Sequence, residues 1–203
     1  MSRPFVVVAV LLLHAQLPLQ AQGQAQTPRA SAYERFNRST DFDKHFSKNS
    51  KRYFGVGFDW RYFKAQAIAE SGLREAARSP VGAIGIMQIM PATFEDIRRE
   101  NPLITGALTQ ARWNIAAGVW YNRQNFMVWK APRPFEDKLK FMFGSYNAGR
   151  GSVLRAQRLA LSDGLDGTLW SSIEARLSAI TGRHSRETLG YVRRIFEVKP
   201  VLK

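Results

Sequence analysis

Hydrophobic residues recur at the spacing of an α-helix through most of the chain from residue 59 onward. Trp60–Ser71 contains few helix-breaking residues, with Asp59 as a candidate N-cap and Gly72 as its stop. Pro91 suits the first position of a second helix, whose acidic residues come early and whose arginines come late, as the helix dipole favours. The pattern therefore predicts two helices in this part of the chain.

Helical spacing continues to the C-terminus. A long helix is expected over Ile115–Lys130, with Asn114 as its N-cap and Pro132 beyond its end. We expect four further helices, over Phe135–Tyr146, Gly151–Leu161, Trp170–Ile180 and Arg186–Val198. No stretch shows the alternation of apolar and polar residues that is typical of a strand. The sequence therefore predicts an all-α domain.

The N-terminus has the pattern of an export signal. Arg3 precedes an apolar run, Phe5–Leu13, and Gly23 and Ala25 form a small-residue pair suited to cleavage. The alternative is a membrane anchor, but the run is much shorter than the roughly 20 residues that a membrane-spanning helix needs. We therefore expect residues 1–25 to be a signal peptide, and the mature protein to be periplasmic or secreted without a membrane anchor.

Residues 26–57 are expected to form a leader to the domain rather than part of its core. They are rich in polar residues, and Gly55 and Gly57 interrupt any helix near the end. We expect partial disorder up to about Thr40, followed by loose helix or docking through Tyr53 and Phe54. The globular domain is then expected to occupy residues 58–203, a length that suits one buried core.

Charge and composition narrow the possible partners and chemistry. The formal net charge of +14 favours an anionic partner, which leaves nucleic acid, a membrane surface and a bacterial cell wall open. Export makes nucleic acid the least natural of these. The chain has no cysteine, which excludes disulfides, a thiol nucleophile, thiolate metal sites and a cysteine-linked lipid. Its three histidines show no metal-ligand spacing.

Glu70 is the leading candidate for chemistry. Tyr62, Phe63, Gln66 and Glu70 share one side of the first predicted helix, so Glu70 lies near an aromatic stripe at the helix end. Burial and the negative end of the helix dipole would both raise the pKa of its carboxyl above the usual value of about 4.3. An acid that stays protonated near neutral pH can donate the proton that cleavage of a glycosidic bond requires. The alternative is a solvated helix-end glutamate.

Three other segments carry groups that suit sugar binding, and each has a purely structural alternative. In Gly82–Pro91, Met87 offers an apolar face and Gln88 a donor and an acceptor, but the segment also suits a core with two turn glycines. Ser145–Gly149 ends a helix in polar groups, as a simple C-cap would. Glu187–Val192 contains Tyr191, which by itself is typical of a half-buried structural tyrosine.

The order of these segments resembles a known family. Glu70-Ser71, Gly85–Pro91, Asn114-Ile115 with Gly118, Ser145–Gly149, and Glu187-Thr188 with Tyr191-Val192 follow one another as in the catalytic domain of soluble-type lytic transglycosylases, which is similar to goose-type lysozyme. The resemblance covers roughly Phe58 to Lys199. Ile86 stands where the family usually has leucine, and Ser145 where it usually has alanine.

The resemblance implies a fold and a reaction. The fold would be all-helical and lysozyme-like, with a groove for peptidoglycan glycan strands. Glu70 would be the sole catalytic carboxylate, first protonating the glycosidic oxygen and then acting as a base. The product would be a 1,6-anhydromuramoyl end, formed without cofactor or metal. We expect a monomer that does not bind nucleic acid.

The resemblance also implies substrate contacts. Ser71 would orient the acetamido group of the reacting sugar, and Tyr191 would hydrogen-bond Glu70. Glu187 would brace the fold through an ion pair. Further contacts to the sugars are implied for the remaining motif residues, Met87, Gln88, Tyr146 and Asn147.

Two other functions remain open. A goose-type lysozyme-like enzyme would cut the same bond with water as the nucleophile. A non-catalytic basic module that binds cell wall or nucleic acid would account for the charge, but it would leave the retention of Glu70 and its companion motifs without a reason. An assay on purified cell-wall sacculi separates a catalyst from a binder.

Overall fold

The computed structural model describes residues 32–203, so the expected signal peptide, residues 1–25, lies outside the described residues. Its helices, with 3-10 helices written η, are η1 Glu34–Arg38, α2 Asp43–Phe54, α3 Arg61–Ser71, α4 Pro91–Glu100, α5 Ala111–Val128, α6 Phe135–Ala148, α7 Arg150–Ser162, α8 Trp170–Thr181, η2 Gly182–His184, α9 Ser185–Val198 and η3 Lys199–Val201. The described part of the chain has no strand, only isolated bridges that join Ile84 to Arg78 and to Ile89. The expected all-α fold class is confirmed for this part.

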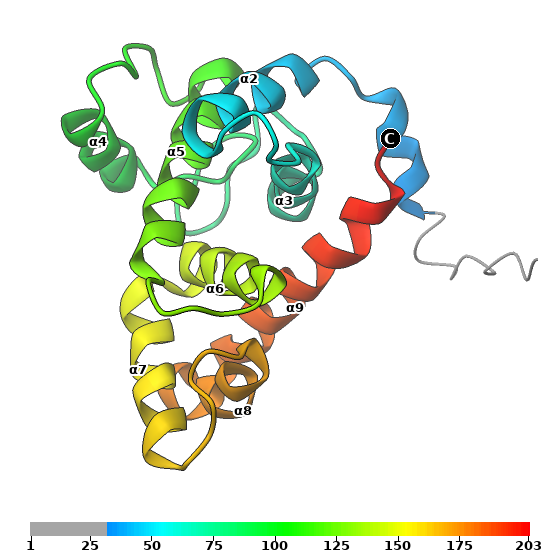
Figure 1. Cartoon of the computed structure of the whole chain (residues 1–203). Coiled ribbons are helices and arrows are strands. Elements are labelled where there is room, and N and C mark those ends of the chain that lie inside the picture. The colour runs from blue at the N-terminus through cyan, green and yellow to red at the C-terminus, as the bar shows by residue number, and fades with distance from the viewer. Residues whose placement is uncertain (1–31) are drawn as a thin grey trace, which may run out of the picture.

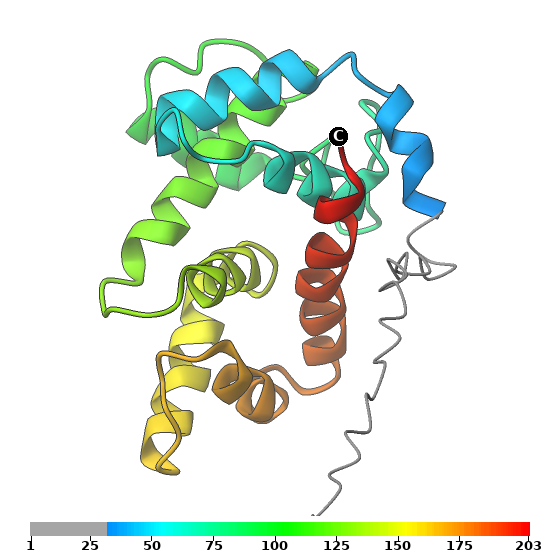
Figure 2. The same cartoon turned by 45° about the vertical axis from the view of Figure 1, so that its right-hand side comes forward.

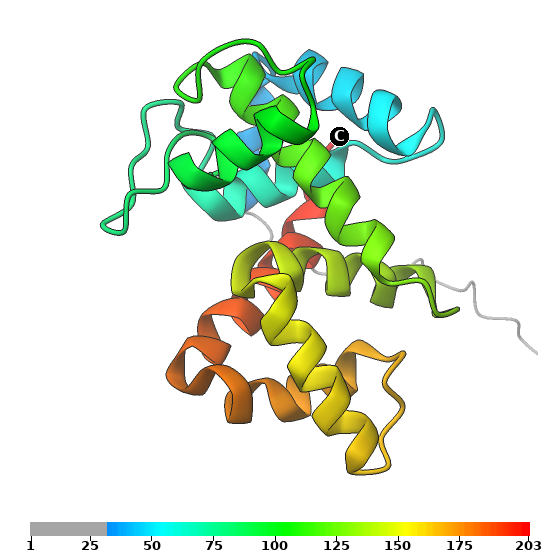
Figure 3. The same cartoon turned by 90° about the vertical axis from the view of Figure 1, so that its left-hand side faces the viewer.

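The helices form two groups that α9 connects. Helices α2 to α5 lie together at one end, and α7 and α8 pack side by side at the other, with α6 between them (Figures 1 and 3). Helix α9 packs against both α6 and α3 and brings the C-terminus to the side of η1 (Figure 2). No helix among residues 32–203 is both long enough and apolar enough to cross a bilayer.

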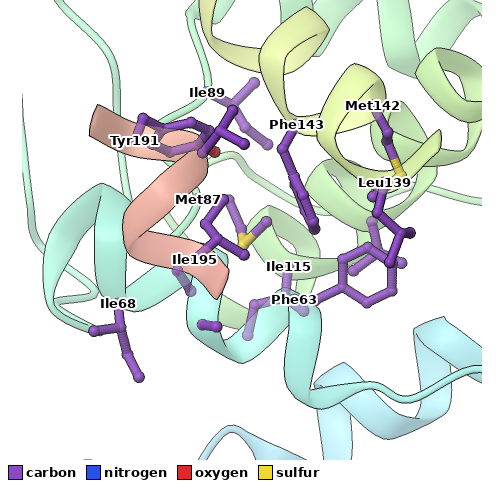
Figure 4. Packing of buried hydrophobic residues seen from close by; sticks show 14 of the residues in the cluster. Phe63, Ile68, Met87, Ile89, Ile115, Leu139, Met142, Phe143, Tyr191 and Ile195 are labelled. Carbon is purple, nitrogen blue, oxygen red and sulfur yellow. The ribbon is translucent and has the colours of Figure 1, made fainter. Parts of the chain in front are cut away.

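Among residues 32–203, one hydrophobic core fills the space between the helices. Phe63 of α3, Met87 of the loop after it, Ile115 of α5, Phe143 of α6 and Ile195 of α9 all converge there without exposed surface (Figure 4). Burial of a side chain of this kind stabilises the fold by about 1.5–3 kcal/mol. The core thereby fixes α3 against α9, the two helices that carry the candidate site.

Most of the predicted helices are confirmed to within two residues at either end. Helix α3 ends where Gly72 adopts the left-handed conformation, with φ 64°, and its N–H donates to the carbonyl of Ile68. The N-cap of α3 is Trp60 rather than the expected Asp59, although the carboxylate of Asp59 accepts the backbone N–H of Arg61 at 3.0 Å. Pro91 is the first residue of α4.

The predicted start of the long helix is wrong. Helix α5 begins at Ala111, so Asn114 lies inside it rather than at its N-cap. The carboxylate of Glu75 accepts the N–H of Ala111 at 3.0 Å and so satisfies one of the free amides of the first turn. The Asn114 side chain is buried in the core, where it hydrogen-bonds the loop over residues 84–89.

The segment before residue 58 contributes to the core, contrary to expectation. Phe46 of α2 has no exposed surface, and Phe36 of η1 is 7% exposed. The ammonium of Lys64 and the carboxylate of Asp43 join α3 to α2 at 2.7 Å. The packed domain therefore begins before residue 58, because α2 covers an apolar face of α3 and α5 that would otherwise meet water.

Candidate active site

Glu70 lies in the last turn of α3 with its carboxyl group partly buried. Its Oε1 accepts a hydrogen bond from the hydroxyl of Tyr191 at 2.5 Å. Burial raises the pKa of Glu70 to about 8, the charge of Glu187 also raises it, and the Tyr191 hydrogen bond opposes both. At neutral pH the group is therefore a protonated acid that can donate a proton, with a hydroxyl in place to stabilise its carboxylate afterwards.

Helix packing places Tyr191 beside Glu70. Tyr191, Thr188 and Ile195 form the buried face of α9, which packs against α3. Tyr191 is 6% exposed, so it is more deeply buried than the sequence alone suggests. Its hydroxyl oxygen also accepts a hydrogen bond from the side-chain amide of Gln66 at 2.9 Å. Gln66 lies one turn before Glu70 on the same side of α3.

The loop over residues 84–89 is fixed against the end of α3. The Ser71 hydroxyl donates to the carbonyl of Ile86 at 2.9 Å, and the Tyr146 hydroxyl donates to the carbonyl of Met87 at 2.8 Å. Ser71 is 5% exposed, and its hydroxyl points at the loop. Ser71 and Tyr146 thus hold the loop that borders the C-terminal end of α3.

Asn114 holds the same loop from the side of α5. Its Oδ1 accepts the N–H of Met87 at 2.7 Å, and its Nδ2 donates to the carbonyls of Ile84 at 2.9 Å and Leu108 at 3.1 Å. Gly85 is required beside it, because a Cβ there would lie 2.5 Å from the Asn114 amide nitrogen and φ is +82°. The loop conformation therefore depends on this asparagine and this glycine together.

Met87 does not have the expected role in this structure. Its side chain has no exposed surface and lies in the middle of the core cluster (Figure 4). A Cβ at Gly118 would come within 2.9 Å of it, so α5 packs closely over the methionine. A side chain enclosed in this way cannot pack against a sugar, and Met87 serves as a core residue.

Gln88 and Asn147 are half-buried and make contacts within the protein. The Gln88 side-chain nitrogen donates to the carbonyls of Gly85 at 2.9 Å and Ala77 at 3.3 Å. The Oδ1 of Asn147 accepts the hydroxyl proton of Thr188 at 2.7 Å, which ties α6 to α9. Their expected contacts to sugar stay predictions.

Tyr146 lies close enough to Glu70 for the charge of the carboxylate to affect the pKa of the tyrosine. Burial, the Glu70 charge and the neighbouring Tyr121 raise the pKa of Tyr146 well above its usual value. The ring centroids of Tyr146 and Tyr121 lie 5.4 Å apart in an edge-to-face arrangement. Tyr146 therefore stays protonated and keeps its donor role toward the loop.

A cavity of about 670 Å³ opens beside Glu70, a size typical of ligand sites. Three arginines of its lining, Arg35, Arg74 and Arg194, take part in no ion pair among residues 32–203. The sequence indicates an anionic partner through net charge alone and does not locate these arginines. The folded chain brings them together from η1, from the turn after α3 and from α9.

Glu187 differs from expectation. It is exposed on α9 and forms no ion pair with any described residue. Its charge reaches Glu70 and raises the pKa of that group. Glu187 therefore acts on Glu70 electrostatically rather than bracing the fold.

Within the described part of the chain, no three histidine, aspartate or glutamate side chains are grouped so that they could hold a metal ion.

The family model described as the transglycosylase SLT domain matches residues 46–164. The chain belongs to the transglycosylase SLT domain family. The matched span begins inside α2 and contains Glu70, Asn114 and Tyr146, whereas Tyr191 lies beyond it. The place of Tyr191 in the site rests on its hydrogen bond to Glu70 in this structure.

Similar proteins include membrane-bound lytic murein transglycosylases F. That of Vibrio vulnificus strain YJ016 is 31% identical over 144 residues, which cover 69% of this chain and 26% of the relative. That of Actinobacillus succinogenes is 32% identical over 147 residues, which cover 70% of this chain and 29% of the relative. This transglycosylase SLT domain thus spans between a quarter and a third of their length.

A solved structure confirms the fold. The 70 kDa soluble lytic transglycosylase of Escherichia coli superposes with a TM-score of 0.60 at 24% sequence identity, over 85% of this chain and 28% of that one. This likeness, together with the helices described above, confirms the expected all-helical, lysozyme-like fold of lytic transglycosylases.

The raised pKa of Glu70 predicts how stability depends on pH. The folded protein binds one proton more than the unfolded chain between the ordinary pKa of 4.5 and the folded value of about 8. The stabilisation by neutral Glu70 is therefore complete below pH 4.5 and is lost as the pH rises toward about 8. Glu70→Gln stays neutral throughout and avoids this loss.

We expect denaturant titrations to show the Glu70→Gln variant gaining on the wild type by a few kcal/mol between roughly pH 5 and pH 8.5. Glu100→Gln, which alters an exposed carboxylate on α4, serves as the control and should follow the wild type. Parallel stability curves for wild type and Glu70→Gln would contradict the raised pKa.

Proposed function

We propose that this chain is a lytic transglycosylase that cleaves the β-1,4 bond between N-acetylmuramic acid and N-acetylglucosamine in peptidoglycan. The supporting observation is Glu70 itself, an acid with its pKa raised to about 8, at the edge of a cavity and hydrogen-bonded by Tyr191. Family membership and the similarity to lytic murein transglycosylases support the same reaction.

In the proposed mechanism Glu70 acts twice. Its carboxyl proton passes to the glycosidic oxygen as the bond to the anomeric carbon breaks, and the acetamido oxygen of the muramic acid stabilises that carbon. The Tyr191 hydroxyl stabilises the Glu70 carboxylate that remains. Glu70 then takes the proton of the 6-hydroxyl of the same sugar, whose oxygen bonds to the anomeric carbon. The ring closes as a 1,6-anhydro sugar, no water is consumed, and Glu70 is protonated again.

We propose that four motif residues contact the glycan around Glu70. Tyr146 and Asn147 lie on the segment that ends α6, and Gln88 lies on the loop that Tyr146 holds. Ser71 follows Glu70 and lines the cavity beside it. Their neutral hydrogen-bonding groups suit sugar hydroxyls and amides.

The arginines beside Glu70 favour binding of a glycan strand that carries negative charge. Arg35, Arg74 and Arg194 can attract the carboxylates of the peptides that peptidoglycan sugars carry. We expect Glu70→Gln protein to bind sacculi less as salt rises, because the Debye length falls from about 10 Å at 0.1 M to about 3 Å at 1 M. Changing the three arginines together to glutamine should flatten this salt dependence in co-sedimentation.

A matched control changes three exposed arginines outside that cavity, Arg155, Arg158 and Arg183. It carries the same loss of charge and should keep most of the salt dependence. Equal effects of the two triple variants would mean that total charge, rather than the cavity, governs capture.

Dye release from labelled sacculi tests the catalytic proposal against a non-catalytic binder. A lytic transglycosylase should release soluble fragments with time, and the Glu70→Gln protein should bind without releasing them. Binding without release by the wild type would leave the binding module as the function. A lysozyme-like hydrolase remains the second candidate, because Glu187 places another carboxylate within electrostatic reach of Glu70.

We further propose that residues 1–25 direct export and that the mature protein acts as a monomer in the periplasm or outside the cell, without a membrane anchor and without nucleic acid as a partner. The supporting pattern is the basic residue, apolar run and small-residue pair of the N-terminus. The intact mass of exported protein tests this. A species starting near Gln26 supports cleavage, and the full-length chain in a membrane fraction contradicts it.

A further inference from the structure

Two buried amide side chains lie behind the Tyr191 hydroxyl. Gln66 of α3 and Asn122 of α5 have no exposed surface. The Asn122 Nδ2 donates to Gln66 Oε1 at 2.6 Å, and the Gln66 Nε2 donates to the Tyr191 oxygen at 2.9 Å. The Tyr191 hydroxyl donates to Glu70 Oε1 at 2.5 Å. The hydrogen bonds form one chain from α5 through the core to the candidate acid.

This chain of hydrogen bonds has a fixed donor-to-acceptor direction. A tyrosine hydroxyl has a single proton, and because Gln66 donates to its oxygen, that proton is left for Glu70. Gln66 cannot turn its amide over, since its NH₂ group would then face the NH₂ group of Asn122. Asn122 is fixed in turn, because the same nitrogen also donates to the carbonyl of Gly118 at 3.0 Å. Each group therefore has one arrangement that satisfies its neighbour.

This arrangement is not the one that stability alone would favour. The Oδ1 atom of Asn122 is buried without a hydrogen-bond partner among the described residues. An unpaired buried amide oxygen destabilises a fold, and two apolar side chains of similar size would fill the same space without it. The pair is therefore better explained by an effect on Tyr191 than by packing.

We propose that Gln66 and Asn122 are positioning residues that hold the Tyr191 hydroxyl as a permanent donor to Glu70, so that the carboxylate is stabilised each time it gives its proton away. The inference rests on the proposed role of Glu70 as the acid. A hydroxyl that accepts one hydrogen bond donates a second one more strongly, so the amides act on Glu70 through Tyr191. Neither amide lies within the motifs that resemble the family.

Other charged and ionisable groups surround Glu70, but they lie outside this chain of hydrogen bonds. They are Tyr146 on α6, Glu187 and Arg194 on α9, Arg74 after α3 and Arg35 on η1. No described hydrogen bond joins any of them to Gln66 or Asn122. Substitution of the amides therefore leaves these groups in place, and their influence on Glu70 is common to all the variants.

The test compares Gln66→Met and Asn122→Leu with the double variant. Each single change leaves a buried partner unpaired and should lower stability, whereas the double variant should recover it. The proposal predicts that the double variant remains about 3- to 10-fold slower on sacculi and that the high-pH limb of its rate profile moves up by roughly half to one pH unit. A double variant that regains stability, wild-type rate and wild-type pH profile would show that the amides are packing alone.

Tyr191→Phe supplies a second test that does not depend on the folding of the double variant. The amides act only through the hydroxyl, so Gln66→Met should change neither rate nor pH profile in the Tyr191→Phe protein. A further slowing of the same size as in the wild-type background would overturn the proposal.

Titration of the Glu70 carboxyl by ¹³C NMR separates this inference from the proposed function. The Gln66→Met variant should titrate at higher pH than the wild type, with no substrate present. A shift of this kind in a protein that cleaves no sacculi would keep the inference and reject the function. An unshifted titration in an active protein would do the reverse.

Discussion

Replacing Glu70 with glutamine should lower the rate of sacculus cleavage by at least about 100-fold, because general acid catalysis alone commonly contributes 10²- to 10⁴-fold. The amide keeps the shape of the side chain and can still accept a hydrogen bond from Tyr191, but it has no acidic proton to donate. Because glutamine replaces a partly buried acid with a neutral group of the same shape, we expect the variant to fold normally. Circular dichroism and binding to sacculi would verify this.

Two matched variants sharpen this result. Glu95→Gln changes an exposed carboxylate on α4 and should leave the rate near that of the wild type. Glu187→Gln removes the charge that raises the pKa of Glu70, so it should move the high-pH limb of activity downward and retain substantial activity. A folded Glu70→Gln protein that keeps more than about a tenth of the wild-type rate would show that Glu70 is not the acid.

Replacing Asn114 with alanine should give the largest loss of stability at a residue that is not itself proposed to react. The change deprives the buried N–H of Met87 and the carbonyls of Ile84 and Leu108 of their partners. Unsatisfied buried groups cost about 1–3 kcal/mol each, and partial relaxation of the loop recovers some of this, so we expect a loss of roughly 3–5 kcal/mol. Chemical denaturation measures it directly.

Asn114→Asp separates the donated hydrogen bonds from the accepted one. It keeps the acceptor for Met87 but buries a carboxylate oxygen against the carbonyls of Ile84 and Leu108, so it should be no more stable than Asn114→Ala, and it should become less stable as the pH rises. Gln124→Ala on the same helix makes no described side-chain hydrogen bond and should change stability by less than about 1 kcal/mol. A loss at Asn114→Ala no larger than that of Gln124→Ala would contradict the bracing role of Asn114.

The helices and the candidate acid can be predicted from the sequence because both depend on local information. Apolar spacing defines which face of a helix is buried, and Gly72 and Pro91 mark a helix end and a helix start by their backbone geometry alone. Glu70 is predictable because it shares a side of α3 with aromatic residues. Helix α2 could also have been found, since Phe42, Phe46 and Tyr53 recur at helical spacing despite the polar residues between them.

The contacts around the acid were not predictable, because they depend on how distant segments meet. The loop that contains Met87 has no periodicity, so nothing local shows that this methionine faces the core while the Gln88 side chain donates to the carbonyls of Gly85 and Ala77. Asparagine is a residue type that often caps helices, so the sequence favours Asn114 as the N-cap. Only the position of Glu75 shows that the helix starts earlier. Gln66 is a polar residue on an apolar helix face, which indicates a buried partner without saying that the partner is Tyr191.

The measurement that tests the central claim most directly is mass spectrometry of the muropeptides released from sacculi. Cyclisation within the muramic acid makes fragments that end in a 1,6-anhydro sugar, lighter by one water than the products of hydrolysis and without a reducing end. The site described here, with Glu70 serving as acid and then as base toward the 6-hydroxyl, predicts anhydro ends in nearly all products. Mainly reducing ends, with ¹⁸O incorporated from labelled water, would mean that a water molecule attacks the sugar, and the transglycosylase account would be wrong.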